Sequence, residues 1–252
     1  MLNLIEHGKP GGTPLLIVHG LYGSARNWGV IAKRLSDSRH VVAVDMRNHG
    51  DSPWRDSHGY PEMAADLAGV IADLGGQADV VGHSMGGKAA MVLGLQHPGA
   101  VRKLLVADIA PVTYGHSQIQ YIDAMRKVDL SRVTKRSDAL EQLAEHVDDA
   151  TLQSFFTQSL DVAGKRWKLN LDVLADDMDK ILSFPDIDGV LEAPTLFLSG
   201  SESDYVQPEH RPKIRTHFPR ARFAKLAGAG HWLHAEKPRE FEASVRAFMG
   251  EG

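Results

Sequence analysis

The chain has 252 residues, of which 43% are apolar and 24% are charged, and its formal net charge is -4. This length and composition are typical of one globular domain with a full hydrophobic core, with room for an insertion. The absence of cysteine excludes disulfides, thiolate metal sites and cysteine nucleophiles. Because the net charge is negative and no segment is rich in lysine and arginine, nucleic acid is not expected as a partner.

The N-terminal sequence MLNLIEHGKPGGTP lacks the basic segment and the long apolar stretch of a secretory signal. No apolar run approaches the roughly 18 residues that a membrane helix needs. Both observations favour a cytoplasmic protein without membrane insertion.

Short apolar runs alternate with helical segments along the chain, which predicts a parallel sheet covered by helices on both faces. The predicted strands lie at 14–20, 40–47, 78–84, 102–110, 194–200 and 221–227. The predicted helices lie at about 24–36, 61–74, 85–97, 207–217 and 237–249.

The alternation stops between residues 111 and 190, where the sequence is rich in helix formers but has no clear buried strand. Structureless loops of this length are uncommon in compact domains. We therefore expect a helical cap at 111–190, inserted in a core formed by 1–110 and 191–252. A run of ordinary peripheral helices would give a similar sequence pattern.

The segment VVGHSMGGKAAM, residues 80–91, places Ser84 at the junction of a predicted strand and a predicted helix. Gly82 and Gly86 complete a G-x-S-x-G pattern, in which small residues permit a sharp turn that exposes the serine. An ordinary strand–helix turn is the alternative, but the strand before and the helix after are the context that the pattern requires. The segment predicts that Ser84 is a nucleophile.

A base for this serine must also follow a strand, because reactive groups gather beyond the carboxyl ends of a parallel sheet. His231, in AGAGHWLHAEKP after the last predicted strand, meets this condition and would accept the Ser84 proton. His234 is the nearest alternative among 13 histidines, but the flanking glycines and the order along the chain favour His231. These two histidines form no metal motif and have no evident third ligand, so no metal is predicted.

Two aspartates are candidates for the carboxylate that orients the imidazole, and the residues alone leave the choice open. Asp108 lies in VADIAP at the end of one predicted strand, and Asp204 lies in SGSESDYV after another. Either loop could reach His231.

An oxyanion hole is predicted from the segment HGLYGS, residues 19–24, which ends the first long strand with a His-Gly pair. The glycine would allow the chain to bend so that the backbone N–H of Leu21 points into the site. The N–H of Met85, directly after the proposed nucleophile, would be the second donor.

Taken together, HGLYGS, DMRNHGDS, GHSMGGKAAM, DIAP and GAGHWLHAEKP resemble the α/β-hydrolase superfamily, and within it the YbfF-like acyl esterases. The resemblance implies an eight-stranded, mostly parallel sheet with a helical cap, a Ser–His–acid triad and no cofactor. It also implies that Asp108 is the acid. The usual acid position in the superfamily, three residues beyond the strand-ending Gly200, is Ser203 here, with Asp204 one step later.

The resemblance implies a serine esterase that cleaves carboxylic or thio esters of small to medium acyl groups through an acyl-enzyme. Its partner would be a small-molecule acyl ester. Haloalkane dehalogenases and epoxide hydrolases need a carboxylate at position 84, so Ser84 counts against both. A cofactor-free perhydrolase, a carbon–carbon bond hydrolase and a ligand-sensing protein would share the same residues, and fold alone does not separate them.

The segment DMRNHGDSP also contains glycine and aspartate, which raises the possibility of a phosphate or metal loop. It lacks the spacing of a phosphate-binding motif, so we interpret it as a structured loop beside the site. Arg47 and His49 are expected to brace this loop rather than to line the pocket.

Overall fold

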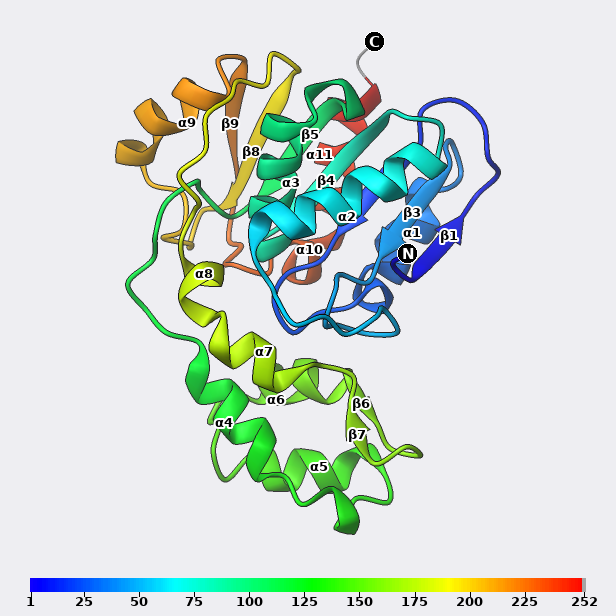
Figure 1. Ribbon diagram of the computed structural model, residues 1–252, viewed down its shortest axis with the longest axis vertical. Helices are drawn as coiled ribbons and strands as arrows, with labels where there is room; N and C mark the ends of the chain where they lie inside the picture. Colours follow the sequence, from blue (N-terminus) through cyan, green and yellow to red (C-terminus); the bar gives the residue numbers. More distant parts are fainter. Residues whose placement is uncertain (251–252) are drawn as a thin grey trace.

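The structure, a computed structural model, describes residues 1–250 (Figure 1). These residues form a central sheet with the strand order β1-β3-β2-β4-β5-β8-β9, in which β1 is antiparallel to β3 and the other neighbours are parallel. Its strands are β1 (Leu4–His7), β2 (Leu15–Val18), β3 (Val41–Val44), β4 (Ala78–His83), β5 (Val101–Ala107), β8 (Thr195–Gly200) and β9 (Ala221–Leu226). The mostly parallel sheet predicted from the sequence is confirmed.

The expected count of eight strands is wrong: within residues 1–250 the central sheet has seven. The segment before β2 supplies only β1. The sequence GKPGG, which follows β1, cannot extend a strand, because Gly8, Gly11 and Gly12 have positive φ angles and Pro10 has no N–H to donate.

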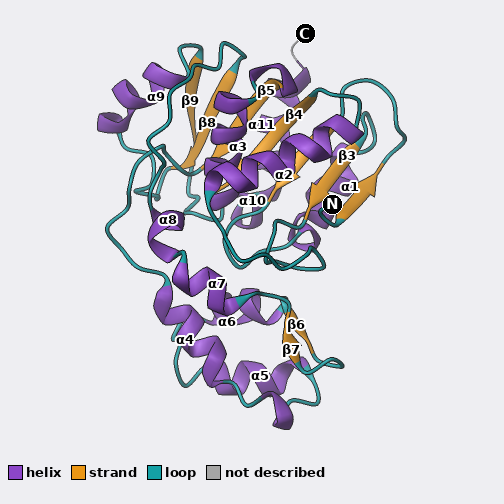
Figure 2. Ribbon diagram, viewed as in Figure 1, coloured by secondary structure: helices purple, strands orange, loops and turns teal. Residues whose placement is uncertain are grey.

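Helices cover both faces of the sheet, as expected (Figures 1 and 2). Alternate strand residues point to opposite faces: Leu15 and Ile17 share one hydrophobic cluster with residues of α1, α10 and α11, whereas Leu16 and Val18 share the other with residues of α2, α3 and α9. These helices are α1 (Gly29–Leu35), α2 (Tyr60–Asp73), α3 (Met85–Gln96), α9 (Arg211–His217), α10 (Leu233–Glu236) and α11 (Pro238–Gly250). No helix in the described part of the chain has the length and apolar character needed to cross a membrane.

Residues 111–190 leave the sheet after β5 and return to it at β8, and we call this segment the insertion. Figure 1 shows α4 to α7 standing apart from the sheet, while α8 lies next to its lower end. It contains α4 (Ile119–Lys127), α5 (Arg136–Leu143), α6 (Ala150–Thr157), α7 (Leu171–Asp176), α8 (Met178–Leu182) and the hairpin of β6 (Leu160–Asp161) and β7 (Arg166–Trp167). The hairpin was not predicted, because two-residue strands are too short to produce an alternating pattern.

The helix α3, which begins directly after Ser84, packs on the end of β2. A Cβ atom added to Gly86 would lie 2.3 Å from the carbonyl oxygen of His19 and 2.5 Å from that of Val18. Only a residue without a side chain allows this approach. The close packing brings the turn at Ser84 against the loop that follows β2.

We expect Gly86→Ala to destabilise the protein, because the added methyl group meets backbone that cannot rotate away. Overpacking of this kind costs about 1–3 kcal/mol, and each kcal/mol lowers the melting temperature by roughly 2–4 °C in a domain of this size. Gly69→Ala is the matched control: Gly69 lies in α2 with open space around it, so alanine should stabilise the helix. Thermal unfolding of both variants checks the prediction, which fails if Gly86→Ala melts at or above the wild-type temperature.

Candidate active site

Ser84 lies between β4 and α3 in a strained backbone conformation, with φ 52° and ψ -122°. Residues with a Cβ atom rarely adopt this conformation, and such strain is concentrated at functional sites. The turn is tight, because a Cβ atom on Gly82 would lie 2.5 Å from the carbonyl oxygen of Gly86. The N–H of Ser84 donates to Ala107 at 3.0 Å, which ties the turn to the end of β5.

Three of the predicted site residues form one hydrogen-bonded chain. Nε2 of His231 lies 3.0 Å from Oγ of Ser84, and Nδ1 lies 2.8 Å from Oδ2 of Asp108. Since a carboxylate only accepts, the proton of the neutral imidazole is assigned to Nδ1, and Nε2 is free to accept the serine proton. This geometry allows the histidine to act as a base toward the serine.

The carboxylate of Asp108 is fully buried at the end of β5. Besides His231, it accepts hydrogen bonds from the N–H of Gly200 at 3.1 Å and from the hydroxyl of Ser203 at 2.5 Å. Asp204 is exposed, and its Oδ1 accepts instead from the side chain of Gln207 at 3.1 Å. The sequence leaves Asp108 and Asp204 as alternatives, and in the structure it is Asp108 that bonds His231.

Two residues at this site were missed as contributors by the sequence reasoning. The sequence marks Ser203 only as a departure from the usual acid position, although a hydroxyl there is suited to bond a carboxylate at the end of the neighbouring strand. The ring of Tyr205 stacks on that of His231, with centroids 4.0 Å apart and planes 22° apart. No sequence pattern indicates this stacking, which depends on how the loop after β8 folds.

Two further imidazoles lie near the site: the ring of His83 is 4.9 Å from that of His231, and the ring of His234 is 4.6 Å from that of His83. Nε2 of His83 donates to the carbonyl oxygen of His231 at 2.8 Å, and the ring of His234 stacks on Trp28 at a centroid distance of 4.2 Å. Burial holds the pKa of His83 well below its usual value and lowers that of His234 to about 3. Both rings therefore stay neutral, and it is His231, not the alternative base His234, whose nitrogen lies within hydrogen-bond distance of Ser84.

The turn expected to form an oxyanion hole passes close to the serine. A Cβ atom on Gly20 would lie 3.2 Å from Cβ of Ser84. Leu21 and Met85 line the same cavity as Ser84. This placement is the one that the two backbone N–H groups would need in order to reach an oxygen bound at the serine.

Two neutral histidines, His19 and His49, are hydrogen-bonded to the backbone of this turn. Nδ1 of His19 donates to Gly20 O at 2.8 Å, while its Nε2 accepts from the N–H of Met46 at 2.9 Å. Nε2 of His49 accepts from the N–H of Tyr22 at 3.2 Å. Burial lowers the pKa of both imidazoles, which keeps their acceptor nitrogens unprotonated.

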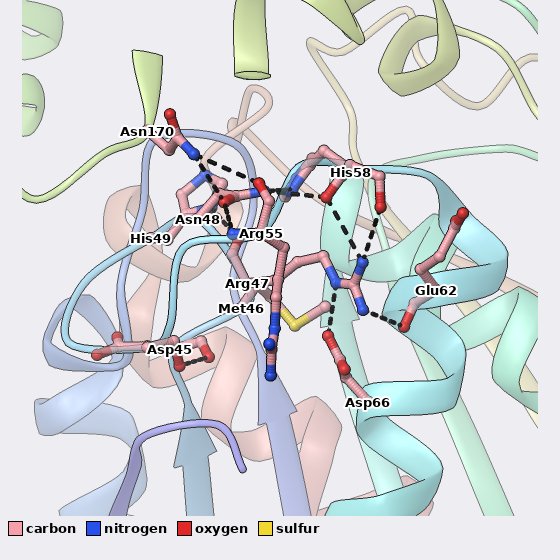
Figure 3. A network of polar contacts seen from close by, with 12 residues as sticks. Asp45, Met46, Arg47, Asn48, His49, Arg55, His58, Glu62, Asp66 and Asn170 are labelled. Atoms are coloured by element: carbon pink, nitrogen blue, oxygen red, sulfur yellow. Dashed lines mark hydrogen bonds and ion pairs between the residues drawn. The ribbon is translucent and has the colours of Figure 1, made fainter. Parts of the chain in front are cut away.

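Arg47 braces the loop between β3 and α2, as the sequence favoured (Figure 3). Its guanidinium donates to Asp66 at 2.6 Å and to the carbonyl oxygen of Glu62 at 3.1 Å. The insertion is hydrogen-bonded to the same loop, because Asn170 Nδ2 donates to Asn48 Oδ1 at 3.1 Å. The loop is thus a structural link between core and insertion.

Beside Ser84 lies a cavity of about 230 Å³. The insertion contributes much of its wall through apolar and aromatic side chains, including Tyr114, Tyr121, Leu152, Phe155 and Phe156. Such a lining suits an apolar ligand placed by a few polar groups. Within residues 1–250 no group of three or more histidine, aspartate or glutamate side chains is arranged to hold a metal ion.

Known proteins share both the sequence and the fold. A family model described as "Alpha/beta hydrolase family" matches residues 15–244. The sn-1-specific diacylglycerol lipase ABHD11 of Mus musculus is 42% identical over 246 residues, which are 93% of this chain and 80% of the relative. Esterase YbfF of Escherichia coli (strain K12) is 37% identical over 243 residues, covering 95% of this chain and 94% of the relative.

A solved structure described as "Marine microorganism esterase" superposes with a TM-score of 0.93 at 38% identity, covering 98% of each chain. The resemblance to YbfF-like esterases inferred from the sequence motifs is confirmed by these similarities. The chain belongs to the alpha/beta hydrolase family.

Proposed function

We propose that this chain is a serine esterase that cleaves carboxylic or thio esters of small to medium acyl groups through an acyl-enzyme. The observation that carries the proposal is the hydrogen-bonded chain from Ser84 through His231 to Asp108, at one side of an apolar cavity. The expected enzyme class, a carboxylic ester hydrolase, agrees with the esterase and lipase names of the relatives.

In the proposed reaction Oγ of Ser84 attacks the carbonyl carbon of the ester while Nε2 of His231 takes its proton. The N–H groups of Leu21 and Met85 stabilise the negative oxygen of the tetrahedral intermediate. The imidazolium then returns the proton to the leaving alcohol or thiol, and Asp108 stabilises its charge. Water, activated by the same imidazole, hydrolyses the acyl-enzyme.

We further propose that the insertion, residues 111–190, acts as a cap over this site. Support comes from the hydroxyl of Tyr22, which donates to the carbonyl oxygen of Gln118 at 2.9 Å, and from Ser159, whose hydroxyl donates to Tyr22 O at 3.0 Å. The expected core is 1–110 and 191–252, and the last two residues of the second segment lie outside the described residues. A cytoplasmic location stays a prediction.

A perhydrolase, a carbon–carbon bond hydrolase or a ligand sensor could use the same three residues. A burst of acyl-enzyme followed by steady turnover of a simple aryl ester supports the esterase. Stoichiometric acylation without turnover would instead support the sensor.

We expect Ser84→Ala and His231→Ala each to lower kcat by about 10⁴ or more, and the double variant to be scarcely worse, because the residues act as one unit. Steady-state kinetics on an aryl ester, with folding checked by circular dichroism, measures this. Strongly additive losses, or near-normal turnover by Ser84→Ala, would contradict the proposed roles.

We expect Asp108→Asn to lower kcat by about 10⁴, because an amide at this position favours the wrong imidazole tautomer. Asp204→Asn, in the same assay, is the control and should change turnover only modestly, since its carboxylate bonds Gln207 and not His231. The assignment is wrong if Asp204→Asn is the inactive enzyme and Asp108→Asn is near normal.

We expect kcat/KM to rise and then fall as the acyl chain lengthens, because each buried CH₂ adds about 0.8 kcal/mol of binding until the cavity is full. A graded series of p-nitrophenyl esters, from acetate upward, measures the profile. A flat profile that is unchanged by substitutions in the insertion would argue against an acyl pocket there.

A further inference from the structure

Lys88 is a buried lysine one helical turn after Ser84 on α3, and only 1% of it is exposed. Its ammonium donates to the carbonyl oxygen of Leu182 at 2.8 Å and to that of Ser183 at 2.6 Å. The same nitrogen lies 4.8 Å from the ring centroid of Tyr114. The proposed ester chemistry uses none of these contacts.

The two carbonyl groups belong to the end of α8, where a helix leaves its last C=O groups without partners of its own. Their neighbour Ile181 is held in the same way, because its carbonyl oxygen accepts from the hydroxyl of Tyr60 on α2 at 2.5 Å. Leu182 O also accepts from the N–H of Tyr114 at 3.1 Å. Side chains of α2 and α3 therefore fix the end of α8 on the core.

This end of α8 is also a wall of the cavity. The residues Ile181 and Leu182 line it together with Lys88, Tyr60 and Ser84. Because packed side chains leave little free volume, moving the end of α8 changes the space available beside the serine. The lysine thus links the helix that carries the proposed nucleophile to the residues that bound the cavity.

Burial and the nearby Lys213 lower the pKa of the Lys88 ammonium to about 7. Keeping an amine in such a place is costly unless its hydrogen bonds are made. The carbonyl groups of Leu182 and Ser183 accept these hydrogen bonds. Leucine or methionine would fill the same volume and would need no hydrogen-bond acceptors. A purely space-filling role therefore does not explain a lysine here.

We propose that Lys88 is a positioning residue for substrate specificity: by holding the end of α8, it sets the longest acyl chain that the site accepts. The inference rests on the proposed ester hydrolysis, because it concerns the same cavity. It assigns Lys88 no contact with the reacting atoms.

The test compares Lys88→Met with Lys103→Met. Lys103 is a second buried lysine, on β5, whose ammonium also donates to two backbone carbonyls, those of Phe248 and Met249 at 3.2 and 3.3 Å. Those carbonyls belong to α11, which does not line the cavity. The control removes the same kind of contact at a place remote from the site.

The measured quantity is the kcat/KM for the p-nitrophenyl ester two carbons longer than the wild-type optimum, divided by that at the optimum. Each buried CH₂ is worth about fourfold, so admitting two more carbons should raise this ratio roughly 15-fold in Lys88→Met. Lys103→Met should keep the wild-type ratio. An unchanged ratio in Lys88→Met, or an equal rise in both variants, overturns the inference.

Tyr60→Phe removes the neighbouring contact to Ile181 without changing charge or shape. Tyr60→Phe should raise the ratio by a smaller factor than Lys88→Met. If Lys88→Met does not fold, the result for Tyr60→Phe decides whether the inference stands. A wild-type ratio in a folded Tyr60→Phe together with an unfolded Lys88→Met indicates a structural role only and overturns the inference.

A second readout does not depend on turnover. In a Ser84→Ala background, calorimetry with straight-chain carboxylates of increasing length gives the length that binds tightest, with and without Lys88→Met. A longer preferred chain in the double variant supports the inference, and an identical preference overturns it. Failure of the proposed function is seen separately, as wild-type protein that hydrolyses no ester or Ser84→Ala protein that still does.

Discussion

The carboxylate of Asp108, buried at the end of β5, accepts hydrogen bonds from the N–H of Gly200, the hydroxyl of Ser203 and the imidazole of His231. A buried charge is tolerated only when such donors surround it. The donors come from β8, from the loop that follows it and from the loop after β9. Satisfying one carboxylate therefore fixes the relative positions of these strand ends, and through His231 it also fixes what faces Ser84.

The insertion joins the core through apolar packing, because Phe156 and Leu174 belong to the same hydrophobic cluster as Val18, and through hydrogen bonds to the loop between β3 and α2. Asp177 accepts from the N–H of His58 at 2.6 Å, and Asn170 bonds Asn48. The proposed division of labour follows from this arrangement. The core supplies the groups for chemistry, held by backbone and buried charge, while the insertion supplies the walls that distinguish one acyl group from another.

Much of this arrangement was predictable, because the sheet and the turn at Ser84 depend on local sequence. The segment around Ser84 combines the end of a strand, three glycines and the start of a helix within a dozen residues, so its placement follows from pattern alone. The choice between Asp108 and Asp204 did not follow from the residues, because it depends on which loop turns toward His231. Tyr205 and Lys88 carried no signal either, since their contacts join segments that are far apart in the chain.

The histidines packed around the site have a consequence for the whole molecule. Burial lowers the pKa of His58 and of His234 to about 3, whereas in an unfolded chain an imidazole takes up a proton near pH 6.5. A lowered folded-state pKa means that the unfolded chain binds more protons between these values, so stability falls as the pH drops below about 6.5. The neutral, buried rings around the site therefore also make the fold sensitive to acid, and mild acidification should loosen the site together with the core around it.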